Sequence, residues 1–148
     1  MKRDTVMIDY LKDFFKKNAR HFKIKTAFLY GSRAGGIPRN DSDIDIAILF
    51  IDASINEDRI FDRITDISLT LSRRLHFEVN IIPIHPDFRY PMLYYNAIVQ
   101  GISLYVNKFD EYIHLKNDAV FHMEDYNLFC RGWQIQIVKR NMEALIHA

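Results

Sequence analysis

The sequence predicts an α/β domain of the α+β type, with a helical extension at its C-terminal end. Two observations predict it. Segments with helical spacing of apolar residues alternate with short apolar or alternating segments typical of strands over residues 1–106, whereas residues 107–148 have helical spacing alone. No repeat, low-complexity tract or long Gly/Ser/Pro linker interrupts the 148 residues. We therefore expect a core domain at 1–106 and a helical extension at 107–148 that packs on the core or forms a partner interface.

The expected elements of the first half follow in order. Asp4 or Thr5 caps a helix that runs to about Arg20 with an apolar face. Residues 25–30 form a short apolar run typical of a buried strand. Residues 42–50 alternate polar and apolar side chains and then become wholly apolar, which predicts a second strand.

The second half continues the alternation. Ser54 and Glu57 have the spacing of a capping box, and they precede a helical apolar stripe that ends at Leu75. Residues 77–82 alternate again and predict a strand. A helix is expected to run from about Pro91 to near Gly101, where glycine favours a helix end.

An acidic pair lies on the second predicted strand. With a period of two, Asp43 and Asp45 project from one face about 7 Å apart along the backbone, while the intervening isoleucines project from the other. Two carboxylates on one face repel each other unless a cation lies between them, and Mg²⁺ prefers such oxygen ligands together with substrate phosphates. Asp43 and Asp45 are therefore candidate metal ligands. For an isolated Asp-x-Asp, a solvated strand face is the commoner explanation.

A second candidate element follows the first strand. Gly31 permits a sharp turn and a close approach to a ligand, Ser32 adds a hydroxyl, and Arg33 adds a guanidinium that can bind phosphate. Backbone amides at such a turn can hold a triphosphate. Taken alone, Gly-Ser after a strand is more often only a turn.

Together these residues resemble a known family, the minimal nucleotidyltransferases of the DNA polymerase beta superfamily. Its signature is Gly-Ser, ten residues, then Asp-x-Asp, and the spacing from Gly31-Ser32 to Asp43 and Asp45 is the same. Gly36 and Ser42 also match, and a weaker resemblance continues to Val106 through a helix, a glycine and a short strand at residues 98–105. The resemblance implies a nucleotidyltransferase fold with a mixed β-sheet, nucleotide phosphates on the Gly-Ser element and Mg²⁺ on the two aspartates.

One position departs from that family. The superfamily places a third carboxylate on a later strand, and the aligned position here is Asn80. A neutral amide cannot act as a general base or give a metal a full negative charge. Glu78 lies two residues away on the same predicted face, so we take Glu78 and Asn80 as candidate catalytic positions beside Asp43 and Asp45. An ordinary exposed acid and a polar edge residue remain the alternative.

Composition limits the remaining classes. The formal net charge of +1 gives no electrostatic footprint for general nucleic-acid binding. Cys130 is the only cysteine, which excludes an internal disulfide and fits a reducing cytoplasm. No apolar run approaches the ~18 residues of a membrane span, and no apolar signal segment follows the charged start. We expect a cytoplasmic protein without a membrane partner.

The C-terminal extension carries an aromatic stripe. Tyr126, Phe129, Trp133 and Ile137 recur every three to four residues. Packing on the chain's own domain is the favoured explanation, and a protein interface is the alternative because aromatic stripes often anchor partners. A homo-oligomer is left open.

Two functional classes follow. The first is a Mg²⁺-dependent nucleotidyltransferase that transfers AMP from ATP to a hydroxyl acceptor. The family resemblance implies that the acceptor is a partner toxin of the HEPN ribonuclease class, with this chain as its antitoxin. The second is a protein with the same fold whose catalysis is impaired, and which binds nucleotide or neutralises its partner by direct contact.

Overall fold

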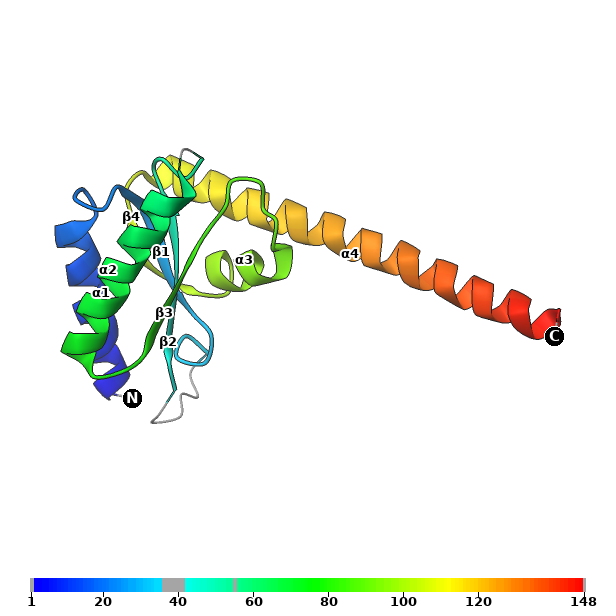
Figure 1. Ribbon diagram of the computed structural model, residues 1–148, viewed down its shortest axis with the longest axis horizontal. Helices are drawn as coiled ribbons and strands as arrows, with labels where there is room; N and C mark the ends of the chain where they lie inside the picture. The colour runs from blue at the N-terminus through cyan, green and yellow to red at the C-terminus, as the bar shows by residue number, and fades with distance from the viewer. Residues whose placement is uncertain (1, 36–41, 55, 148) are drawn as a thin grey trace.

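The computed structural model describes residues 2–35, 42–54 and 56–147 of the 148-residue chain, and a four-stranded sheet lies at its centre. The elements, shown in Figure 1, run in the order α1 (Lys2–Asn18), β1 (Ile24–Tyr30), β2 (Ile44–Phe50), α2 (Glu57–Leu75), β3 (Val79–Pro83), α3 (Pro91–Ile98), β4 (Ile102–Val106) and α4 (Phe109–Ile146). The alternation of helices and strands expected from the sequence is confirmed.

The sheet is mixed, and its register brings polar side chains to one end. Its strand order is β3-β2-β1-β4, with β1 antiparallel to both β2 and β4, and β2 parallel to β3. Tyr30 at the end of β1 pairs with Asp45 near the start of β2, and Asp45 in turn pairs with Asn80 of β3. The end of β1 and the starts of β2 and β3 therefore meet at one edge of the sheet.

Apolar side chains cover both faces of the sheet. Helices α1 and α2 pack on one face, where Ile44, Ile46 and Ile48 are fully buried. Helix α3 and the first part of α4 pack on the other face, against Phe28 and Ala47. Because side chains alternate along a strand, Asp45 shares the α3 side with Ala47. Burial of the isoleucines on the first face thus fixes the side on which the acidic pair emerges.

Four helix ends differ from the sequence expectation. Helix α1 already includes Lys2, so Asp4 lies in its first turn and neither Asp4 nor Thr5 is its N-cap. Asn56, and not Ser54, is the N-cap of α2, because its side-chain oxygen accepts a hydrogen bond from the Asp58 backbone N–H at 3.0 Å. Asn56 directly precedes Glu57, the first residue of α2, and can cap the helix from that position, whereas Ser54 lies three residues before Glu57. Helix α1 ends at Asn18, two residues before Arg20, and α3 ends at Ile98, three residues before Gly101.

Helix α4 leaves the domain partway along its length. Leu115 and Ala119 are buried against the α3 side of the sheet, and the His122 ring stacks on Phe88 with centroids 4.6 Å apart. Beyond that contact the helix projects from the body of the molecule (Figure 1). Phe129 is 71% exposed and Trp133 is 60% exposed.

Packing of the aromatic stripe on its own domain is therefore wrong for this part of α4. The physical reason is length, since a helix of 38 residues outruns the sheet and α3 that cover its beginning. In the part of the chain that the structure describes, neither this helix nor any other combines the length and apolar character needed to cross a membrane.

The isoleucines of β2 give a direct test of the core. We expect Ile46→Ala to lower the free energy of unfolding by about 2–4 kcal/mol, because its side chain is fully buried in the central strand. Ile51→Ala is the matched control, since Ile51 is 60% exposed and its truncation should change stability by less than about 0.5 kcal/mol. Urea denaturation of both variants measures the difference; equal losses would contradict the described burial.

Candidate nucleotide and metal site

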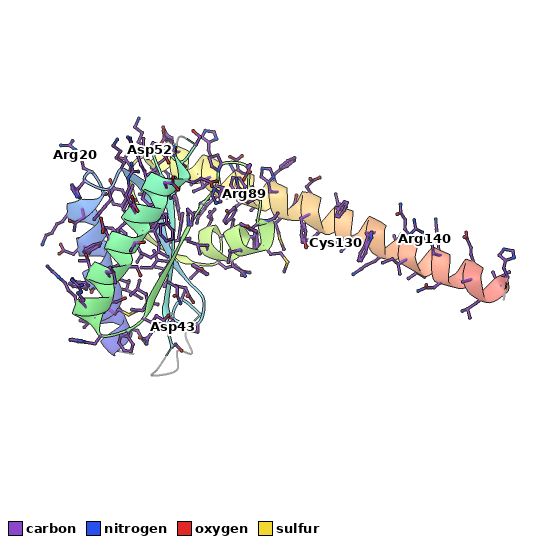
Figure 2. All side chains as sticks on the ribbon, in the orientation of Figure 1. Arg20, Asp43, Asp52, Arg89, Cys130 and Arg140 are labelled. Atoms are coloured by element: carbon purple, nitrogen blue, oxygen red, sulfur yellow. The ribbon has the colours of Figure 1, made fainter. Side chains whose placement is uncertain are left out.

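The two aspartates of the Asp-x-Asp motif lie at the start of β2. Asp43 directly precedes the strand and is exposed, while Asp45 lies within it and is partly buried. Figure 2 shows Asp43 at the end of the sheet opposite Asp52. From β3, the Asn80 side-chain amide donates a hydrogen bond to Asp43 Oδ2 at 3.3 Å. The structure thus brings together three of the residues singled out from the sequence.

The environment of Asp45 disfavours its charge. Burial raises the pKa of the Asp45 carboxyl above its ordinary value, and repulsion from Asp43 adds to that rise. A hydrogen bond from the Asn80 side chain works against it and lowers the pKa of Asp45. Asn80 is therefore placed to interact with both carboxylates. A divalent cation at this edge would lower the pKa of Asp45 in the same direction as the Asn80 hydrogen bond does, and more strongly, because the cation carries full positive charge.

Gly31 joins the turn after β1 to this acidic pair. Its φ of +76° lies in the left-handed region, and a Cβ built on it would lie 2.6 Å from Asp45 Oδ2. The backbone N–H groups of Ala34 and Gly35 both donate to the Gly31 carbonyl at 3.2 Å, which closes a tight turn. Gly31 and Ser32 are exposed. The turn predicted to bind phosphate and the predicted metal ligands therefore form one continuous surface.

Arg33 faces the interior and not the solvent. Its guanidinium donates to the Ser42 carbonyl through Nε at 2.9 Å and forms an ion pair with Asp4 at 3.2 Å. It also lies 4.3 Å from the centre of the Phe77 ring, and its side chain is 5% exposed. These contacts tie the turn to α1, to the entry of β2 and to the segment before β3. Of the three residues assigned to phosphate from the sequence, Arg33 is engaged elsewhere in this conformation.

A cavity of about 380 Å³ adjoins the turn. It is lined by Tyr30, Gly31, Ala34, Gly35, Asn96, Gln100 and Gly101. Burial, and then the nearby Asp45 carboxylate, raise the pKa of the Tyr30 hydroxyl to about 12, so it keeps its proton at neutral pH. Asn96 and Gln100 were missed from the sequence. Asn96 lies in α3 and Gln100 lies two residues beyond its end, beside Gly101, so helical spacing within the sequence does not bring the two together.

Glu78 occupies a different position from Asn80. It precedes β3, its side chain is exposed, and its backbone carbonyl accepts a hydrogen bond from the Ile44 N–H at 2.9 Å. Among the residues that the structure describes, no group of three or more His, Cys, Asp or Glu side chains is arranged to hold a metal ion. Glu78 therefore does not complete such a group with Asp43 and Asp45 in this conformation. Gly36, which also matched the sequence motif, lies outside the described residues.

The need for glycine at position 31 can be tested by comparing alanine substitutions at Gly31 and Gly35. Gly31→Ala should lower the free energy of unfolding by about 1–2 kcal/mol, because alanine disfavours the left-handed conformation, and its methyl group would also displace the Asp45 carboxylate. At Gly35 an added Cβ meets only ordinary contacts, 3.7 Å to the nearest atom, so Gly35→Ala is the control and should be close to neutral. Thermal unfolding compares them; a neutral Gly31→Ala would contradict the close approach.

Comparison with known proteins is consistent with this geometry. No curated protein matches the chain. Among solved structures, a chain of a complex described as a toxin-antitoxin with AMP-PNP superimposes with a TM-score of 0.66 at 17% identity, covering 86% of this chain and 98% of that one. A chain of the complex between a tri-AMPylated Shewanella oneidensis HEPN toxin and its MNT antitoxin gives 0.61 at 16% identity, with 88% and 98% covered. The MntA-HepT toxin-antitoxin gives 0.62 at 15% identity, also with 88% and 98% covered.

At these identities the solved structures show a shared fold, and the family follows from a separate match. Residues 10–110 match the model of the polymerase beta nucleotidyltransferase family, which spans most of the chain and includes the turn, the acidic pair and Asn80. The chain belongs to the polymerase beta nucleotidyltransferase family.

Proposed function

We propose that this chain binds ATP with Mg²⁺ at the edge formed by β1, β2 and β3, and transfers AMP to a hydroxyl group of a partner toxin of the HEPN class. The observation that carries the proposal is the close approach of Gly31 to Asp45. This close approach brings an exposed backbone turn and two carboxylates into one site, and a metal-bound triphosphate requires that combination. The role of antitoxin is supported by the folds that resemble this one, which come from toxin-antitoxin complexes.

The residues present fit a magnesium ion. Asp43 and Asp45 supply two carboxylates, and because burial and the Asp43 charge raise the pKa of Asp45, a cation beside the pair would stabilise its ionised form. Asn80 adds an amide whose oxygen is also a suitable ligand, since a side-chain amide can turn either end toward a neighbour. When bound, the ion neutralises phosphate charge and orients the triphosphate. The exposed Gly31 backbone and the Ser32 hydroxyl lie in the turn beside this edge and can donate to phosphate oxygens.

The proposed transfer step requires a general base. A bond forms between the acceptor oxygen and the α-phosphorus, the bond from that phosphorus to the bridging oxygen of pyrophosphate breaks, and the acceptor proton must leave. Asn80 cannot take that proton. Glu78 is the exposed carboxylate nearest to Asn80 along the chain, directly before β3, and we take it as the candidate base.

A second function is favoured by the contact of Asn80 with Asp43. A neutral amide that donates to the carboxylate stabilises the acidic pair without adding charge or basicity. The chain would then bind nucleotide or its partner and transfer AMP slowly, neutralising the toxin by contact. The two functions differ in the fate of labelled ATP. Incubation with ATP, Mg²⁺ and a HEPN-class partner, followed by mass spectrometry, distinguishes AMP on the partner from unmodified partner in a stable complex.

The metal ligands give the first test of this proposal. In an Asp43→Asn, Asp45→Asn double variant, Mg²⁺-dependent ATP affinity should fall at least about tenfold, because phosphate charge is left without its cation. Calorimetry with and without Mg²⁺ measures it. Asp52→Asn is the control, because Asp52 carries the same charge but pairs with Arg63 at the opposite end of the sheet. Unchanged affinity in a folded double variant would remove Asp43 and Asp45 from the site.

Asn80 gives the second test. If it occupies the position of the third carboxylate, Asn80→Asp should increase the rate of AMP transfer, since a positioned general base contributes about 10²–10⁴-fold. Single-turnover transfer to the partner measures this rate.

The control for that measurement is Glu78→Gln, which removes the competing carboxylate and preserves its shape. Brisk transfer by the unaltered chain, loss on Glu78→Gln and no gain on Asn80→Asp would together show that Glu78 is the base. That result would exclude the impaired alternative and leave the nucleotidyltransferase proposal standing.

A further inference from the structure

The projecting part of α4 carries a second apolar row besides the aromatic stripe. Phe121, Leu128, Ile135 and Met142 recur every seven residues and are 65%, 66%, 56% and 58% exposed. A spacing of seven keeps side chains on one side of a helix that pairs with another helix. By helical spacing this row lies on the side of α4 roughly opposite to Ala119, which packs on the domain. An apolar row of about 33 Å is thus open to a partner.

The charged residues between these apolar positions would face opposite charges if two copies of the helix ran antiparallel. Asp125, Gly132 and Lys139 also recur every seven residues, on the same side of the helix, with the glycine midway between an acid and a base. If a second α4 runs antiparallel with the two Gly132 positions opposite each other, Asp125 of each copy lies level with Lys139 of the other. The same register places Leu128 within one residue of Ile135 in the other copy, and Phe121 within one residue of Met142.

We propose that this row, from Phe121 to Met142, is a homodimer interface in which two α4 helices pair antiparallel about Gly132. The contact is isologous, so each favourable pair occurs twice. Gly132 has no atom within 4 Å of an added Cβ and leaves room for the other helix at the crossing. The inference is independent of the proposed activity, because none of these residues belongs to the nucleotide site.

The opposite side of α4 is less suited to the same pairing. An antiparallel copy centred on Cys130 would place its residues 141–146 beside residues 114–119 of the first helix. That space is already filled, since Leu115 and Ala119 are buried there against the domain. On the side of the proposed interface, His114 and Phe121 are exposed, so the same length of a second helix is unobstructed.

Exchange of charges within the 148-residue chain tests whether the partner is a second copy and whether the two helices run antiparallel. Sedimentation velocity under reducing conditions, over a concentration series, should show a reversible dimer. Asp125→Lys and Lys139→Asp should each weaken dimerisation about tenfold or more, because each single change places like charges opposite one another twice. The double variant carrying both changes should restore the dimer. A change in folding alone would not produce that rescue.

Two further variants locate the interface. Ile135→Glu should also produce monomer, whereas Gln134→Lys, on the other side of the helix, should leave the dimer intact. Circular dichroism checks that each variant keeps its helix. A chain that stays monomeric throughout, single charge changes without effect, or a double variant that is not rescued would each overturn the proposal.

Discussion

The close approach of Gly31 to Asp45 is the constraint on which the site depends. Gly31 has a φ of +76°, which favours glycine, and a Cβ there would lie 2.6 Å from Asp45 Oδ2, so any other residue would be strained and would displace the carboxylate. The antiparallel pairing of β1 with β2 brings the two residues together, and burial of the isoleucines of β2 decides which face the aspartate takes. A local conformational property of glycine therefore allows the turn after β1 and the acidic pair of β2 to lie at one surface.

Arg33 shows how the rest of the domain holds that surface in place. Its buried guanidinium contacts Asp4 at the start of the chain, the Ser42 carbonyl before β2, and the Phe77 ring before β3. Each contact joins the turn to a different element, and the charge is compensated by Asp4. The arrangement positions Gly31 and Ser32 without using Arg33 as a ligand.

Local patterns in the sequence predicted most of the elements, because each depends on spacing within a few residues. The period of two around Asp43 and Asp45 and the apolar run before Gly31 place strands that the structure contains. The inward turn of Arg33 was not predictable in this way, since its partners Asp4 and Phe77 are distant in sequence. The exposure of the stripe on α4 was missed for a related reason. Spacing shows which side of a helix is apolar, but only the three-dimensional structure shows how far along α4 the sheet and α3 bury that side.

The amide at Asn80 changes the charge of the site as well as its basicity. A third carboxylate there would face Asp43 and Asp45 and raise further the pKa of an aspartate that burial already disfavours as an ion. The amide instead donates to Asp43 and partly offsets the rise in the pKa of Asp45 that burial and the Asp43 charge cause. Under the proposed function, a neutral amide at Asn80 would also hold a cation less strongly than a third carboxylate would, so this one side chain would influence both nucleotide affinity and transfer rate.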